Sequence, residues 1–121
     1  MSNSSKIGTI GEKKAAAFLK ESGYAVIEQN YRLPWGEVDL IAHDTNALVF
    51  CEVKTWNCFG EENLEKAVGR GKQRKIISVA KHFIRNYPEY EKDRIRFDVI
   101  LVKDNLSSIK HIKNAFGVNH G

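Results

Sequence analysis

The chain has 121 residues, of which 42% are hydrophobic and 28% are charged, and its formal net charge is +4. This length predicts a single domain with one hydrophobic core, spanning residues 1–121 with flexible ends at 1–5 and 117–121. The composition excludes a disordered chain, and no apolar run is long enough to cross a bilayer. The first residues lack the apolar stretch of a signal peptide, so we expect a cytoplasmic protein.

The N-terminal part of the chain predicts a helix followed by a short strand. Thr9 and Glu12 have the spacing of a capping box, which marks a helix start, and Gly23 is the residue type that often follows a helix end. We expect the strand at residues 25–31, before Pro34-Trp35-Gly36 breaks the chain. Apolar residues recur at helical intervals at Ile7, Ile10, Ala15, Phe18 and Leu19.

Two strands joined by a tight turn are predicted next, at residues 37–43 and 48–55. Residues 44–46 are Asp-Thr-Asn, which favour a turn, so the strands are expected to form a hairpin with His43 opposite Leu48.

A long amphipathic helix at residues 72–87, ended by Pro88, is the main feature of the second half. A short helical piece at 63–68 precedes it, and strands are predicted at 96–102 and 108–113. The order of helix, three strands, helices and further strands predicts an α/β (α+β) fold with helices packed on a central sheet.

Three carboxylates and a lysine gather on one face of the predicted hairpin. Its register puts Asp39 opposite Glu52 and Glu37 opposite Lys54. Opposed carboxylates on a covered sheet are destabilising unless a cation compensates them, and Mg²⁺ prefers such oxygen ligands. A lysine beside that cation would suit metal-assisted hydrolysis of a phosphodiester. The alternative is a set of ion pairs on a solvated face, which an isolated Glu-x-Lys usually represents.

These two strands also carry a family resemblance. The sequences Gly-Glu-Val-Asp-Leu-Ile-Ala at 36–42 and Val-Phe-Cys-Glu-Val-Lys-Thr at 49–55 resemble the PD-(D/E)xK nuclease signature, and more closely the YraN-like family of predicted endonucleases. The resemblance covers nearly the whole chain, with further matches at Gly11-Glu12, Gly23-Tyr24, Asn30-Tyr31-Arg32, Arg96-Phe97-Asp98-Val99 and Asn114-Ala115-Phe116. It implies a restriction-endonuclease-like fold, with a central mixed sheet flanked by helices, similar to archaeal-type Holliday-junction resolvases.

The resemblance also implies roles for individual residues. Asp39 and Glu52 would be ligands of Mg²⁺ or Mn²⁺, and Lys54 would be the catalytic lysine. Glu12 would be a further acidic catalytic residue from the first helix, although its place in the capping box explains it equally well. Glu37 is expected to support the site.

The chain departs from the family pattern at three positions. Trp56 stands where the family commonly has an arginine, which removes an expected phosphate contact, and Cys51 replaces a usual valine. Gln73 is a supporting candidate from the Gln-x-x-x-Tyr motif of some exonuclease relatives, but Ile77 takes the place of the tyrosine.

Cations gather at the start of the long helix, where acidic residues are usual: Arg70, Lys72, Arg74 and Lys75. A phosphate ligand would explain them, because free backbone N–H groups at a helix start also favour anions. The alternative is a solvated, solubilising face. Arg32 is a further candidate for binding nucleic acid. Trp35 and Trp56 could stack on unpaired bases or cover the edge of the core.

Together these features predict a Mg²⁺- or Mn²⁺-dependent nuclease that acts on DNA more readily than on RNA, including branched or non-duplex DNA. The alternative is a non-catalytic module that binds nucleic acid, or that depends on a partner protein. No membrane association is expected, and the likeness to resolvases leaves a homodimer open. Asp98 is expected to have a structural role, paired with Arg96 or with a nearby helix end.

Overall fold

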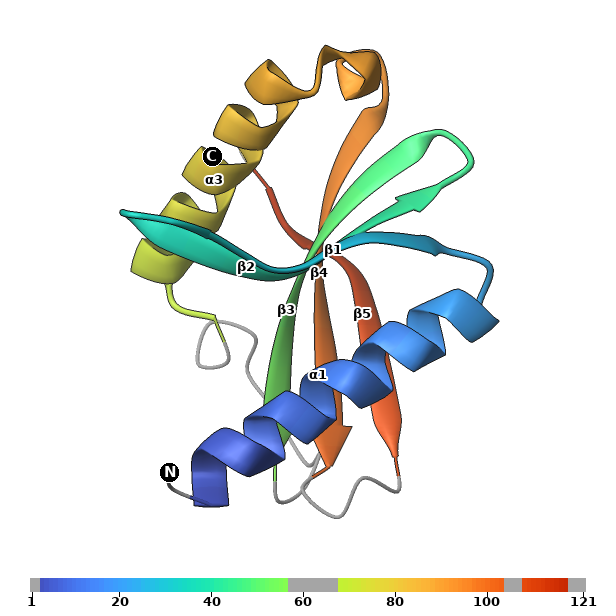
Figure 1. Cartoon of the computed structure of the whole chain (residues 1–121), viewed down its shortest axis with the longest axis vertical. Helices are drawn as coiled ribbons and strands as arrows, with labels where there is room; N and C mark the ends of the chain where they lie inside the picture. The colour runs from blue at the N-terminus through green and yellow to red at the C-terminus, as the bar shows by residue number, and fades with distance from the viewer. Residues whose placement is uncertain (1–2, 57–67, 104–107, 118–121) are drawn as a thin grey trace.

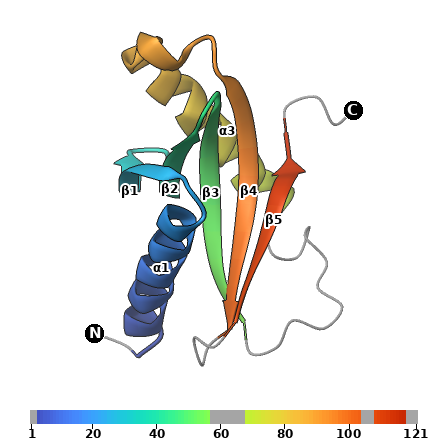
Figure 2. The ribbon, with the colours of Figure 1, turned by 90° about the vertical axis from the view of Figure 1, so that its right-hand side faces the viewer.

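The computed structural model of the chain describes residues 3–56, 68–103 and 108–117. Its five strands form one sheet in the order β1-β2-β3-β4-β5, with α1 and α3 on opposite sides of it (Figures 1 and 2). The elements are α1 (Asn3–Glu21), β1 (Ala25–Leu33), β2 (Gly36–Asp44), β3 (Ala47–Trp56), α3 (Arg70–Asn86), the 3-10 helix η1 (Pro88–Tyr90), β4 (Arg94–Lys103) and β5 (Ile109–Phe116).

The sheet is mixed, because β3 and β4 are parallel while the other neighbouring strands are antiparallel. This confirms the predicted α+β fold with helices flanking a central mixed sheet, and it is consistent with a restriction-endonuclease-like architecture. The predicted helix at 63–68 lies, apart from Val68, outside the described residues. Within the described part of the chain, no helix is long and apolar enough to span a membrane.

Each helix buries its apolar stripe against one face of the sheet. On the α1 face, Leu19 packs in a cluster with Leu40 of β2 and Val49 of β3. On the α3 face, Phe83 packs in a cluster with Phe50, and the two rings meet edge to face with centroids 5.9 Å apart. The sheet is therefore covered on both sides, so a charged side chain on either face has to be compensated.

The first helix begins earlier than the capping box predicts. Helix α1 starts at Asn3, so Thr9 and Glu12 lie inside it and do not mark its start. The chain before Thr9 contains no proline to stop a helix, and the helix continues through that segment. The predicted helix end is confirmed: Gly23 has a φ of +96°, and the N–H of Tyr24 donates to the carbonyl of Leu19 at 2.9 Å.

The predicted hairpin register is confirmed near its turn and ends sooner than expected. His43 pairs with Leu48, and the β2–β3 ladder runs from there as far as Leu40 and Cys51. Beyond that pair, β2 stays with β1, while β3 continues beside β4 to its end at Trp56. Figure 1 shows the β1–β2 turn pointing away from the lower part of β3. The strands thus form a fork, and the candidate site lies at it.

Candidate functional site

Asp39 is the residue of β2 at which the fork opens. Its Oδ2 accepts a hydrogen bond from the backbone N–H of Val53 at 2.8 Å, so a side chain of β2 satisfies a backbone donor of β3. The side chain is 9% exposed. Asp39 is therefore fixed beside β3 at the point where strand pairing between β2 and β3 ends.

Glu52 of β3 is the most deeply buried acid of the site, with an exposure of only 2%. Its Oε2 lies 2.5 Å from Nζ of Lys72 and 3.5 Å from Nζ of Lys54. Its Oε1 is the one buried side-chain oxygen or nitrogen of the described residues that has no hydrogen-bond partner. Because an unsatisfied buried oxygen costs about 1–3 kcal/mol, this atom is poised to accept a ligand.

The two carboxylates influence each other strongly. Burial and the negative charge of Glu52 raise the pKa of Asp39 to about 8, although the hydrogen bond from Val53 acts in the opposite direction. Asp39 is therefore largely protonated at neutral pH in the protein without metal. A cation bound between the carboxylates would relieve both effects, because it offsets the burial and the mutual repulsion.

Helix α1 brings Glu12 toward the same fork. A close approach of the helix to β3 places it there, since a Cβ added to Gly11 would lie 3.0 Å from Oγ1 of Thr55. Burial raises the pKa of Glu12, a hydrogen bond with the Asn30 side chain acts in the opposite direction, and the charges of Glu37 and Glu52 raise the pKa again. Glu12 thus lies within electrostatic reach of Glu52. Its predicted role in a capping box with Thr9 does not apply, because both residues lie inside α1.

The donor set suits a hard divalent cation that keeps most of its water. Among the described residues, no group of three His, Cys, Asp or Glu side chains could hold a metal ion. Mg²⁺ and Mn²⁺ do not require such a group, because one or two carboxylates, water and substrate oxygens complete their coordination. Asp39 and the unpartnered oxygen of Glu52 fit that requirement.

Glu37 lies away from the position that the extended register predicted. It pairs with Arg32 across the β1–β2 ladder, and Nε of Arg32 donates to its Oε2 at 2.9 Å. The opening of the fork explains this, because β2 pairs with β1 and not with β3 at this level. The predicted pairing of Glu37 with Lys54 is therefore wrong.

An open groove of about 730 Å³ adjoins the fork, between the β1–β2 turn and the start of α3. Lys72 belongs to both, since its amine contacts Glu52 and its side chain lines the groove. The groove is lined by Arg32, Leu33, Pro34, Trp35, Gly36, Glu37, Gly71, Lys72 and Lys75. Two predicted cations of α3 and the predicted Arg32 thus share one surface beside the carboxylates.

The remaining predicted residues of α3 lie around its first turns. Arg70 begins the helix, and Arg74 and Lys75 are exposed. The helix start has neither a side-chain cap nor an acidic residue. Gln73 donates from its side-chain amide to the carbonyl of Val68 at 2.8 Å, which anchors the beginning of α3.

Comparison with known proteins shows the family. The sequence profile of the Uncharacterised protein family UPF0102 matches residues 11–102. The chain belongs to the UPF0102 family. A UPF0102 protein of Clostridium botulinum strain 657 is 41% identical over 116 residues, covering 93% of this chain and 94% of that protein. UPF0102 proteins of Treponema pallidum strain Nichols and Persephonella marina are 38% and 36% identical, each covering more than nine-tenths of both chains.

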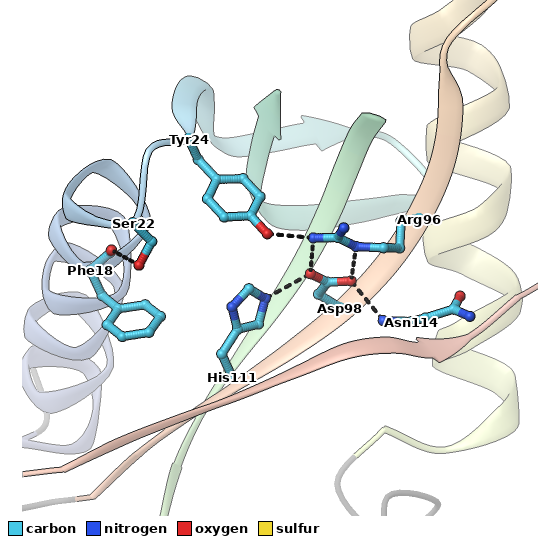
Figure 3. Close-up of polar contacts among 7 residues, drawn as sticks. All are labelled: Phe18, Ser22, Tyr24, Arg96, Asp98, His111 and Asn114. Atoms are coloured by element: carbon cyan, nitrogen blue, oxygen red, sulfur yellow. Dashed lines mark hydrogen bonds and ion pairs between the residues drawn. The ribbon is translucent and has the colours of Figure 1, made fainter. Parts of the chain in front are cut away.

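This UPF0102 protein has a second polar cluster, on the α1 side of the sheet (Figure 3). Asp98 is fully buried, and its Oδ2 accepts from Arg96 at 2.9 Å and from His111 at 2.7 Å. Its Oδ1 accepts from Nε of Arg96 and from the backbone N–H of Asn114, each at 2.9 Å. These donors lower the pKa of Asp98 against the effect of burial. Both oxygens are occupied, so the predicted structural pairing with Arg96 is confirmed.

Two features of the UPF0102 site were missed by sequence reasoning. The contact of Lys72 with Glu52 depends on how α3 crosses the sheet, which no local pattern specifies. The participation of Tyr24 and His111 in the Asp98 cluster was also missed. Nη2 of Arg96 donates to the Tyr24 hydroxyl at 2.7 Å, and the centroids of the Tyr24 and His111 rings lie 6.0 Å apart. An aspartate within an apolar strand was the available signal that such partners exist.

Proposed function

We propose that this UPF0102 protein is a nuclease of the PD-(D/E)xK kind, which uses Mg²⁺ or Mn²⁺ to hydrolyse phosphodiester bonds in DNA. The observation that carries the proposal is the environment of Glu52. This carboxylate is buried beside a second acid, one of its oxygens has no partner among the described residues, and two lysine amines flank the other. A structural ion pair would need neither the free oxygen nor the second carboxylate.

Asp39 and Glu52 are the residues that would hold the cation. When bound, such a cation polarises the phosphate and lowers the pKa of a coordinated water. The protein contributes fixed and buried carboxylates, because the Val53 N–H holds Asp39 in place and Glu52 has little freedom in the covered sheet. Groups that are already fixed in place act more strongly on developing charge than groups that must first reorient.

Lys54 is the candidate for the group that acts on the reacting atoms. It follows Glu52 on the same face of β3, and its amine lies 3.5 Å from the carboxylate while its side chain is one-third exposed. An ammonium in that position can orient a water molecule and stabilise negative charge on a phosphate. Glu12, approaching from α1, is the candidate for an additional acid that holds water near the same centre.

The basic residues near the fork suit a polyanionic substrate. Lys72, Lys75 and Arg32 line the groove, while Arg70 and Arg74 belong to the exposed start of α3. Contacts of this kind bind phosphates without reading sequence. They support a nucleic acid as the substrate. DNA with branched or non-duplex regions, cytoplasmic location and homodimer formation are further predictions of this proposal.

A non-catalytic role is the second candidate, and the Lys72–Glu52 contact favours it. A lysine amine already neutralises Glu52 without any metal, so the site could persist as an internal ion pair in a module that only binds nucleic acid or a partner protein. This role requires no cleavage and no dependence on Lys54.

The two functions are separated by a cleavage assay on labelled duplex, single-stranded, flapped and four-way-junction DNA and on RNA. Wild-type protein and Lys54→Met are compared with Mg²⁺, with Mn²⁺ and with chelator. The nuclease proposal predicts metal-dependent cleavage that Lys54→Met abolishes, while calorimetry shows that the variant still binds Mn²⁺. Absence of cleavage on every substrate, or equal cleavage by both proteins, would refute the role of Lys54 and favour the binding module.

A further inference from the structure

We infer that the groove beside the fork is a subsite for one unpaired nucleotide, whose base stacks on Trp35 and whose phosphate lies against Lys72 and Lys75. The inference rests on the proposed nuclease function for the kind of partner. It adds a part of the substrate, an unstacked base, that the carboxylates and lysines of the fork do not themselves specify.

Trp35 is exposed and yet held in one position. Its side chain is 45% exposed, although tryptophan is the largest apolar side chain and its exposed area costs free energy in water. The ring is nevertheless held in place. Its indole N–H donates to Oγ of Ser78 at 3.2 Å, and its ring meets that of His82 edge to face, with centroids 5.4 Å apart. An aromatic ring that is both exposed and fixed is prepared to stack on a planar ligand.

A close contact between the start of β2 and α3 fixes the shape of the groove. Gly36, the first residue of β2, follows Trp35, and a Cβ added to Gly36 would lie 3.2 Å from Cγ2 of Val79 and 3.4 Å from Cβ of Lys75. The start of β2 therefore packs directly against α3, and a larger residue would push the two apart. Trp35 and the lysines of α3 are held in a fixed relation by this contact.

The groove carries basic side chains and lies next to the candidate metal ligands. Lys72 and Lys75 line it from α3, and Glu37, the only acid among the described residues that line it, is already paired with Arg32. Lys72 also contacts Glu52, so the groove opens directly onto the candidate metal ligands. An aromatic face combined with cations is the usual combination for single-stranded nucleic acid, where stacking holds the base and cations hold the backbone. An anion without a ring would contact only the cations, and an uncharged apolar ligand would contact only the aromatic ring.

Tryptophan fluorescence offers a direct test, because Trp35 and Trp56 are the only two tryptophans of the chain. In Trp56→Phe, all tryptophan emission comes from Trp35. The protein is titrated in chelator, which prevents cleavage, with single-stranded oligothymidylate of about 12 nucleotides. Oligouridylate of the same length and a blunt duplex are the further arms, which separate deoxyribose from ribose and unpaired from paired bases. We expect the single strands to quench the emission at saturation and the duplex to leave it nearly unchanged.

A binding measurement with Trp35→Leu completes the test. Loss of one stacked base is expected to weaken single-strand binding about 10-fold and to leave duplex affinity unchanged. The matched control is Tyr87→Leu, which removes another exposed aromatic ring, at the far end of α3 and outside the groove. Tyr87→Leu should keep the wild-type affinity for both single-stranded and duplex DNA.

The outcomes distinguish the subsite from the nuclease proposal. Unchanged emission with bound single strand, or equal weakening of single-strand and duplex binding in Trp35→Leu, would overturn the subsite while metal-dependent cleavage could still stand. A protein that binds neither single strands nor duplex would overturn the subsite together with the nucleic-acid part of the proposed function.

Discussion

Nζ of Lys72 lies 2.5 Å from Oε2 of Glu52, so a lysine of α3 neutralises a buried carboxylate of β3. A divalent cation on the same carboxylate would meet this ammonium as a like charge. Lys72 and the metal are therefore expected to compete for Glu52, and a displaced Lys72 would be free to contact a phosphate in the groove that it lines.

Replacing Lys72 by methionine should accordingly strengthen metal binding. Removing an ion pair of a half-exposed lysine is worth about 1 kcal/mol, or roughly 5-fold in the dissociation constant for Mn²⁺. Isothermal titration calorimetry measures this constant directly. Lys75→Met is the control, since it removes the same charge three residues further along α3. Equal or weaker Mn²⁺ binding by Lys72→Met would show that Lys72 does not compete with the metal.

The raised pKa of Asp39 predicts how stability depends on pH. Because this pKa is about 8 in the folded protein and near 4 in the unfolded chain, the folded state holds an extra proton between these values. Stability of the metal-free protein should therefore fall as pH rises from about 4 to 8, by at most about 1.4 kcal/mol per pH unit from this group. The raised pKa of Glu12 acts in the same direction.

Urea unfolding of wild-type protein and Asp39→Asn at several pH values checks this. The asparagine keeps an oxygen that can accept from the Val53 N–H but cannot ionise, so its stability should depend less on pH. A wild-type protein whose stability rises with pH across this window, or parallel profiles for the two proteins, would show that Asp39 is ionised without metal.

Because α1 approaches β3 closely, the effect of Gly11→Ala on stability should depend on whether residue 55 is threonine. Alanine normally stabilises a helix interior relative to glycine by about 1 kcal/mol. Gly11→Ala should instead destabilise this protein, because the added Cβ would lie 3.0 Å from Oγ1 of Thr55. In a Thr55→Ala background, which removes that oxygen, the same substitution should become stabilising. Thermal unfolding of the four proteins measures the coupling, and additive effects would contradict the predicted contact.

The Asp98 cluster predicts a strong structural effect. Asp98→Asn leaves Arg96 and His111 without their charged partner inside the protein, which should cost about 3 kcal/mol of unfolding free energy. Glu91→Gln, at an exposed position, is the control and should change stability by less than about 0.5 kcal/mol. Urea midpoints provide the measurement. A similar stability for both variants would mean that the cluster contributes little.

Local sequence patterns predicted the strands and the central hairpin because each depends on neighbouring residues. Alternating apolar residues and the Asp-Thr-Asn turn determine the register in which His43 faces Leu48, and the structure confirms it. The same reasoning failed for Glu37, because extending a register assumes that both strands keep pairing. Whether β2 stays with β3 or with β1 depends on the rest of the sheet.

Long-range contacts explain the other differences. The cations of α3 were visible in the sequence, but the distance between Lys72 and Glu52 depends on the path of the chain across the sheet. The predicted start of the first helix was wrong for a different reason. Thr9 and Glu12 have the spacing of a capping box, yet such a pair marks a start only when the chain before it leaves the helix.

In the proposed function, Glu52 holds a divalent cation with which the protein cleaves nucleic acid. The most direct test is the rate of DNA cleavage at increasing Mn²⁺, for wild-type protein and for Glu52→Gln, which is nearly identical in size. We predict a wild-type rate that rises with Mn²⁺ and saturates, and a loss of about 100-fold or more in Glu52→Gln. Cleavage that is independent of Mn²⁺, or equal rates for the two proteins, would contradict the claim.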